Sequence, residues 1–245
     1  MADLRDEIPE IDPDKSAATD YALIALDTFV PVVGGAIADL SRGMLARKAE
    51  ERQNEFNTLV ATEVAKISER VNELTPEAIL ESDEFMAAYS AASRVAAESD
   101  SKAKRARLAR ALSKMGPWEN ISRDRRARFF TLVMRYSDLH VFLLRYFRDP
   151  PAWLRQNAPK WQPGRYMMAG IETVLGEHVF RGERDWKETI QPILGEITAD
   201  GLGQVPLGTT MSEDGTVQKR TSSLGDQFLD FIGADDSLGE ALPPV

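Results

Sequence analysis

The amino-acid sequence predicts a mainly α-helical protein with an amino-terminal helical bundle that contains one long helix, a central buried helix, and a carboxy-terminal winged-helix-like module with a short β-hairpin. Residues 41–74 contain no proline, and their apolar residues recur every three or four positions, as on one helix face. Residues 129–147 are apolar on nearly every side, which is typical of a buried helix. Paired strand and turn signals are concentrated near residues 205–221.

The composition of the 245-residue chain is that of a globular protein, since 43% of its residues are hydrophobic and 28% are charged. The chain has no cysteine, which excludes disulfides, thiolate metal sites and a cysteine nucleophile. Its acidic start lacks the basic and apolar regions of a secretory signal, so we expect a cytoplasmic protein that is at most peripheral to the inner membrane. The formal charge of −9 disfavours extensive contact with nucleic acid.

We expect four segments along the chain. Residues 1–15 are predicted to be a flexible arm, because acids and two prolines replace any apolar period. Residues 16–121 form the helical hairpin and bundle, and residues 122–233 form the central helix plus the winged-helix-like domain. Residues 234–245 are acidic, end in proline and are predicted to be a flexible tail.

Residues 16–40 are the most apolar part of the amino-terminal half. Three aspartates divide them into pieces shorter than the about 20 apolar residues that a membrane-spanning helix needs. One interpretation is two buried helices joined at a proline-glycine-glycine bend. The other is an apolar hairpin that leaves the fold for a membrane or an oligomer interface, with contacts through Pro31, Gly34, Gly35 and Ile37, because glycines let helices approach closely.

Local signals place the next helices. Thr75 is predicted as an N-cap with Pro76 at the first helical position. The helix that follows carries one buried stripe, made of Phe85, Tyr89, Ala92 and Ala96.

Residues 101–130 hold ten basic residues against two acidic ones, and a helix over about 102–114 carries the first six of the bases. We expect its apolar residues, Leu108, Leu112 and Met115, to face inward. One interpretation of the charge is phosphate contact, for which the candidates are Lys102, Lys104, Arg105 and Arg107. The other is an ordinary solvated helix face that balances nearby acids.

The central helix is predicted to begin at Ser122 and to end at a pair of prolines after residue 149. Helices over about 165–175 and 186–199 precede two short strands, 205–210 and 216–221, around an Asp-Gly turn. This order is that of a winged-helix module. Residues 164–233 hold six basic against eleven acidic residues, the wrong sign for phosphate, and Lys219 with Arg220 is the one local argument for DNA.

No catalytic constellation is recognisable in the sequence. The two histidines, His140 and His178, belong to no metalloprotease, P-loop or hydrolase motif. We expect His140 in the core and His178 in solvent. The acids Glu81, Asp83 and Glu84 are interpreted as first-turn acids that complement a helix start, not as metal ligands. We therefore expect no enzyme activity, no metal and no cofactor.

Two passages resemble those of a known group. Residues 30–35 (VPVVGG) precede a long charged helix, and residues 221–232 read TSSLGDQFLDFI. Together they resemble a diffuse set of uncharacterised bacterial proteins with a glycine-containing apolar opening, a helical bundle and a winged-helix-like end. Some of that set resemble the Abi-alpha group of phage abortive-infection proteins. The resemblance implies phage defence as a setting and supplies no catalytic residues.

The sequence therefore favours a non-enzymatic bacterial interaction or effector protein that acts through protein or membrane contacts of its helical half. We expect a protein partner or self-association, and a membrane is the further candidate. The alternative is a winged-helix DNA-binding regulator, which the acidic module disfavours.

Overall fold

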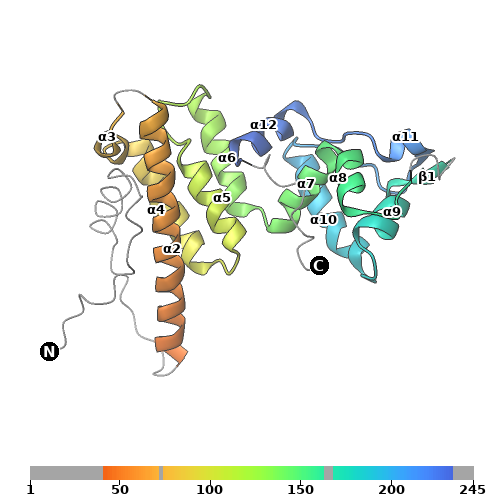
Figure 1. The fold of residues 1–245 in the computed structure, drawn as a ribbon, viewed down its shortest axis with the longest axis horizontal. Helices are drawn as coiled ribbons and strands as arrows, with labels where there is room; N and C mark the ends of the chain where they lie inside the picture. Colours follow the sequence, from red (N-terminus) through yellow and green to blue (C-terminus); the bar gives the residue numbers. More distant parts are fainter. Residues whose placement is uncertain (1–40, 72–73, 163–167, 234–245) are drawn as a thin grey trace. The chain divides into compact units, whose positions relative to one another are not determined.

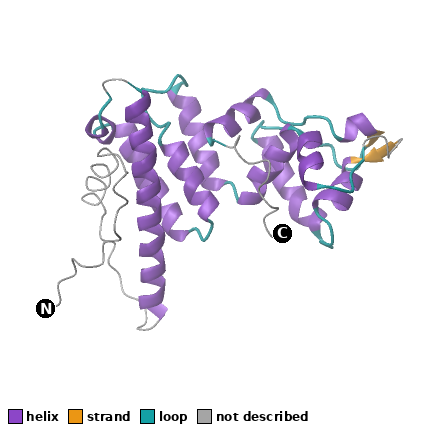
Figure 2. Ribbon diagram, viewed as in Figure 1, coloured by secondary structure: helices purple, strands orange, loops and turns teal. Residues whose placement is uncertain are grey.

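The structure is a computed structural model that describes residues 41–71, 74–162 and 168–233. The described residues fall into two compact units. The first holds residues 41–100 and Leu112–Arg123, and the second holds Ser101–Ala111 and residues 124–233. Helices make up most of both units, loops and turns connect them, and the second unit also contains a small two-stranded sheet (Figure 2). The prediction of a mainly α-helical fold is confirmed.

The first unit is built on helix α2 (Ser41–Arg70), which packs along α4 (Asp83–Glu98), with the short α3 (Pro76–Leu80) between them in sequence (Figure 1). The predicted stripe on α2 is buried from Phe56 to Ile67. Phe56 stacks on Tyr89 of α4 with ring centroids 6.2 Å apart. Asn57, in the same contact, accepts a hydrogen bond from the Tyr89 hydroxyl at 2.9 Å. The long stripe is therefore satisfied within the chain over this stretch.

Capping side chains fix the starts of α3 and α4. The Thr75 hydroxyl accepts the Ala78 amide at 3.3 Å, and the Ser82 hydroxyl accepts the Phe85 amide at 3.4 Å. All four residues of the predicted α4 stripe are buried, as expected. Asp83 and Glu84 lie in the first turn of α4, where acids complement the partial positive charge of the helix start.

The second unit contains most of the remaining elements. In order they are α5 (Lys102–Leu112), α6 (Arg123–Arg135), α7 (Asp138–Arg148), α8 (Pro150–Asn157), β1 (Met168–Gly170), α9 (Ile171–Val174), the π-helix η1 (Leu175–Val179), α10 (Trp186–Ala199), β2 (Thr210–Ser212), α11 (Glu213–Thr216) and α12 (Ser223–Phe231). Leu108, Leu112 and Met115 are buried, as predicted for the basic helix.

The central helix is buried but not continuous, which corrects the prediction of one helix from Ser122 to the prolines. It breaks after Arg135, and Ser137 is the N-cap of α7 in a capping box with His140. The apolar pattern hid this break because it continues on both sides of it with buried residues, among them Phe129, Leu132, Leu143 and Tyr146. The physical cause is local: the Ser137 hydroxyl accepts the His140 amide in the first turn of the new helix.

The two-stranded sheet uses other segments than the expected hairpin. β1 pairs antiparallel with β2, and Met168, Ala169 and Gly170 lie opposite Ser212, Met211 and Thr210. Residues 213–216, expected to hold the turn and the start of a strand, form α11 instead. An isolated antiparallel bridge between Gly203 and Thr221 pairs the chain before β2 with the chain after α11. The winged-helix assignment stays a prediction.

The core of the second unit is aromatic. The ring centroid of Phe129 in α6 lies 5.7 Å from that of Phe228 and 5.4 Å from that of Phe231, both in α12. Helix α12 comes so close to the chain after α10 that a Cβ on Gly225 would lie 2.0 Å from the carbonyl oxygen of Leu202. This close approach explains why a helical position carries glycine.

The boundaries predicted for the helix over 165–175 are wrong. Residues 168–170 form β1, and helical structure then runs from Ile171 to Val179 with a π-helical end. Within that end Gly176 faces the Trp186 indole, since a Cβ there would lie 3.3 Å from the ring. His178 is 5% exposed, so the prediction that it lies in solvent is also wrong.

Candidate interaction surfaces

The predicted apolar contact residues lie outside the described part of the chain. These residues are Pro31, Gly34, Gly35 and Ile37. The surfaces that follow are those of residues 41–71, 74–162 and 168–233.

The basic helix α5 does not display its arginines. Arg105 and Arg107 are 3% and 4% exposed, so they are packed inside the fold and not presented to a phosphate. Arg107 pairs with Asp138 at the start of α7, and the Ser101 hydroxyl donates to the same carboxylate at 2.6 Å. Lys102 is exposed. Burial, then the charge of Arg107, lowers the pKa of half-buried Lys104 against an opposing effect of Asp138.

Several arginines bind the carbonyl groups at helix carboxyl ends. Arg52 donates to Ala97 at the end of α4 at 3.3 Å, Arg110 to Gly233 after α12 at 3.1 Å, and Arg128 to Asp200 after α10 at 2.7 Å. The last carbonyls of a helix have no partner within it and carry the negative end of the helix dipole, so a guanidinium at a helix carboxyl end is a favourable cap. Part of the basic charge that sequence reasoning assigned to phosphate or solvent therefore has a structural use.

Asp200 takes part in more than one of these contacts, because its carboxylate is bound as well as its backbone carbonyl. Its carboxylate pairs with Arg135 and accepts the Tyr136 hydroxyl at 2.6 Å. Burial, and then the hydrogen bond to Asp200, raises the pKa of Tyr136 above its usual value. The group ties the end of α6 to the end of α10.

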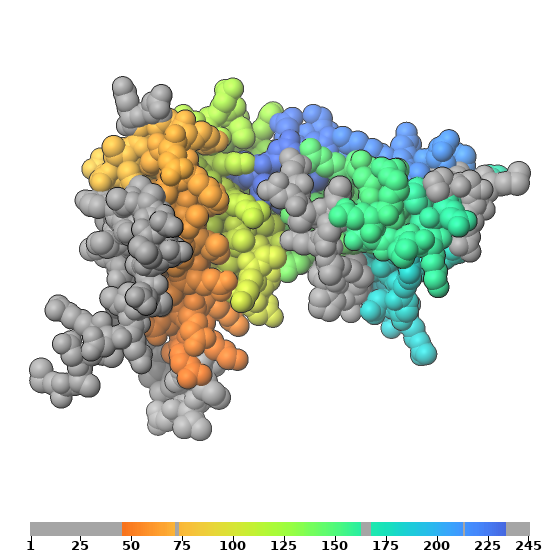
Figure 3. Space-filling view, viewed as in Figure 1, coloured from red at the N-terminus to blue at the C-terminus, as the bar shows by residue number. Residues whose placement is uncertain are grey.

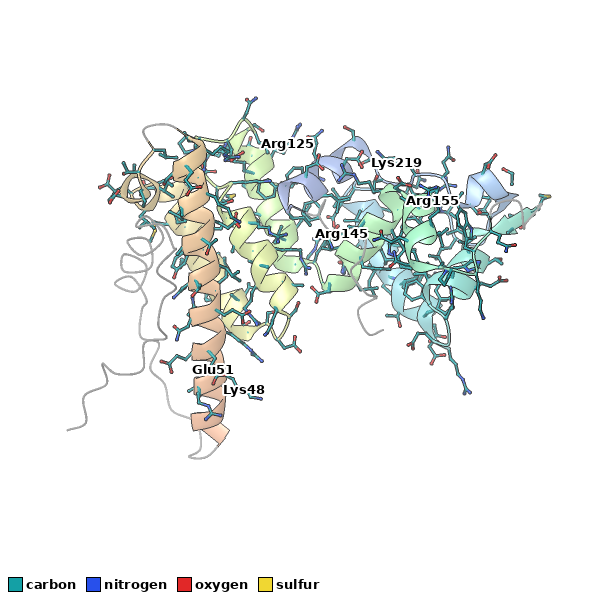
Figure 4. All side chains as sticks on the ribbon, viewed as in Figure 1. Lys48, Glu51, Arg125, Arg145, Arg155 and Lys219 are labelled. Carbon is teal, nitrogen blue, oxygen red and sulfur yellow. The ribbon has the colours of Figure 1, made fainter. Side chains whose placement is uncertain are left out.

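The two candidate DNA residues are engaged within the second unit. Lys219, labelled in Figure 4, pairs with Asp226 at the start of α12. Arg220 donates to the Gly215 carbonyl at 2.6 Å and lies 3.2 Å from the Met211 sulfur. On α10, Lys187 lies 3.4 Å from Glu172, while Glu188 and Gln191 are exposed. These contacts weaken the electrostatic argument for DNA.

The amino end of α2 is the most exposed helical segment of the first unit. Ala46, Arg47, Lys48, Glu50 and Glu51 are all exposed, and they belong to the orange end of the space-filling view (Figure 3). Lys48 and Glu51 project from this end of the helix (Figure 4). Arg47 and Glu51 form an exposed ion pair at 3.6 Å. The sequence contained the signal, because the apolar stripe is sparse before Phe56.

No group of three or more His, Cys, Asp or Glu side chains in the described residues is placed to hold a metal ion. Among the helices of residues 41–71, 74–162 and 168–233, none has the length and apolar character to cross a bilayer. His140 is 7% exposed, as expected for a core histidine.

Comparisons with protein-family models, with curated proteins and with solved structures find no match to this chain.

Proposed function

We propose that this chain is a non-enzymatic bacterial interaction or effector protein, with phage defence as its setting, that acts through protein or membrane contacts of its helical half. The observation that supports the proposal is the exposed amino end of α2, from Ala46 to Glu51. A helix normally gains most of its stability from packing an amphipathic face. A helical segment that is polar and exposed on nearly all sides is typical of a connection between bodies or of a segment that meets a partner.

The position of this segment in the sequence supports the same proposal. It directly follows the most apolar stretch of the amino-terminal half, which contains Pro31, Gly34, Gly35 and Ile37. Between Phe56 and Ile67, by contrast, α2 is packed on its own bundle. A partner is therefore expected to meet the first part of α2 and the apolar stretch before it, and not the packed part.

A charge reversal with a matched control tests this assignment. Arg47→Glu changes the exposed end of α2, and Arg94→Glu makes the same charge change on an exposed position of α4. The full-length chain is examined by light scattering over a range of concentrations and by flotation with vesicles of phosphatidylethanolamine and phosphatidylglycerol. We expect self-association or vesicle binding that Arg47→Glu and Gly34→Leu weaken and Arg94→Glu preserves. A chain that stays monomeric and unbound under all these conditions, with the variants unchanged, contradicts the proposal.

The alternative, a winged-helix DNA-binding regulator, is favoured by the order β1, α9, α10, β2 and by the exposed Gln191 on α10. It predicts DNA affinity that falls with salt and falls again when Lys219 and Arg220 become alanine. Absent or unchanged binding at about 50 mM salt removes it, since phosphate contacts are strongest at low ionic strength.

A further inference from the structure

His140 joins the start of α7 to helix α10. Its Nδ1 lies 2.8 Å from the Ser137 hydroxyl and accepts the Ser137 backbone N–H at 3.2 Å. Its Nε2 lies 3.3 Å from a carboxylate oxygen of Glu196. Because Nδ1 accepts a backbone N–H, the neutral ring carries its proton on Nε2, which donates to Glu196.

This capping box has a histidine at its third helical position, and a histidine changes its hydrogen-bonding groups with pH. The third helical residue is commonly Glu or Gln, whose side-chain oxygen reaches back to the N-cap amide. Such an oxygen stays an acceptor at neutral and mildly acidic pH. A histidine nitrogen does not, because a protonated ring has two donors and no acceptor.

The charged groups around the ring come from α6 and α10. Glu196 and Asp200 lie on and after α10, and Arg135 ends α6. Burial has the largest effect and lowers the pKa of His140; Glu196 and Asp200 oppose it, and Arg135 adds to it. Asp138 faces α5, where it meets Ser101, Arg107 and Lys104. Helix α12 contributes Phe228, an uncharged side chain that lies against Tyr136. The ring is therefore neutral at neutral pH and becomes charged on acidification.

Two contacts keep the ring in place once it is charged. Tyr136 stacks on it with centroids 4.5 Å apart, an arrangement that also favours a cation. Glu196 provides the second contact, because its carboxylate attracts the positively charged ring. The ring stays, but the 2.8 Å contact to the Ser137 hydroxyl reverses its direction, since Nδ1–H now donates, and the Ser137 N–H loses its acceptor.

We propose that Ser137 and His140 form a proton-operated joint between α6 and α7, in which protonation of Nδ1 opens one arm of the capping box. Ser137 is exposed, so water takes over the freed amide. The joint follows directly on Arg135 and Tyr136, which clamp Asp200. Acidification therefore loosens the connection between the clamped end of α6 and the buried helix α7. This inference is independent of the proposed function.

The test is an NMR titration of the full chain from pH 7.5 to 5, following the ring carbons of both histidines and the exchange of the Ser137 amide. We expect the amide shift and its protection to follow the titration of the His140 ring. Protection corrected for intrinsic exchange should fall about fivefold, the factor that corresponds to about 1 kcal/mol for one helix cap.

Two variants separate the proton from the cap. His140→Gln keeps an acceptor at the third helical position but does not titrate, so the Ser137 amide should stay protected across the range. Ser137→Ala removes the hydroxyl cap, so the start of α7 should exchange faster at every pH. The proposal is overturned if His140 titrates without any response of the Ser137 amide. It is equally overturned if His140 stays neutral until the protein unfolds, or if His140→Gln responds to pH as the parent does.

Discussion

Gly225→Ala and Gly195→Ala make the same chemical change in two helices of the second unit, and the structure predicts opposite results. A Cβ on Gly225 would lie 2.0 Å from the Leu202 carbonyl oxygen, whereas a Cβ on Gly195 would meet nothing within 4 Å. The Leu202 carbonyl cannot move freely, because it accepts the Ser222 amide at 2.9 Å beside the bridge between Gly203 and Thr221. Backbone has to shift to admit the methyl group at Gly225.

The magnitudes follow from overpacking and helix propensity. Overpacking at Gly225 costs about 3 kcal/mol, the upper part of the usual range, because the opposing atom is backbone. The better helix propensity of alanine returns about 1 kcal/mol, which leaves a net loss of about 2 kcal/mol. For a chain of this size that corresponds to a fall in Tm of about 4 to 8 °C. Gly195→Ala gains about 1 kcal/mol of stability from the better helix propensity of alanine and loses nothing to overpacking, so it should raise Tm by about 2 to 4 °C.

Urea unfolding followed by circular dichroism, with thermal melts alongside, measures both variants against the parent. The unfolded chains of the two variants lose the same glycine freedom, so a difference between them reports on the folded state. Equal stabilities for the two variants, or a Gly225→Ala protein as stable as the parent, would refute the close approach of α12 to Leu202.

Two further predictions concern other contacts. Tyr89→Phe should lower the free energy of unfolding by about 1 kcal/mol in urea unfolding, because buried Asn57 loses one hydrogen bond; an unchanged midpoint would argue against that bond. Asp138→Asn should flatten the dependence of stability on pH below about pH 4, near the ordinary pKa of aspartate. Burial alone would raise the pKa of Asp138, but the hydrogen bonds from Ser101 and Arg107 hold it below its usual value. The folded chain therefore binds this proton more weakly than the unfolded chain, and the stabilisation is present above the unfolded pKa and lost as pH falls through the folded pKa. Unfolding curves from pH 7 to 3 with the same acid loss in parent and variant would contradict this.

The amino-terminal helices could be predicted because their signals are local. The periodicity of α2, the Thr75-Pro76 start and the stripe on α4 each depend on residues within a few turns of one another. The break at Ser137 also has a local cause, but an unbroken apolar pattern on both sides concealed it. A histidine in place of Glu or Gln at the third helical position removed the usual signature of a capping box.

The misplaced features depend on distant residues. The pairing of Met168 with Ser212 joins segments that are far apart in sequence, so no turn signal announces it. The burial of Arg107 depends on Asp138, 31 positions away. From the sequence alone, a buried arginine on a charged helix cannot be told from a solvated one, because the position of its carboxylate partner is not known. Candidate phosphate contacts were therefore the least predictable part of the surface.

The most direct test of the proposed contact surface uses the absence of native cysteine. Ala46→Cys places a single label on the exposed end of α2, and Ala87→Cys places one on an exposed position of α4. Each labelled full-length chain is followed by electron paramagnetic resonance as protein concentration rises and as phosphatidylethanolamine–phosphatidylglycerol vesicles are added. We predict that the label at position 46 becomes immobilised or shielded from a water-soluble relaxation agent while the label at position 87 does not. Identical behaviour of the two labels under every condition would contradict a contact surface at the start of α2.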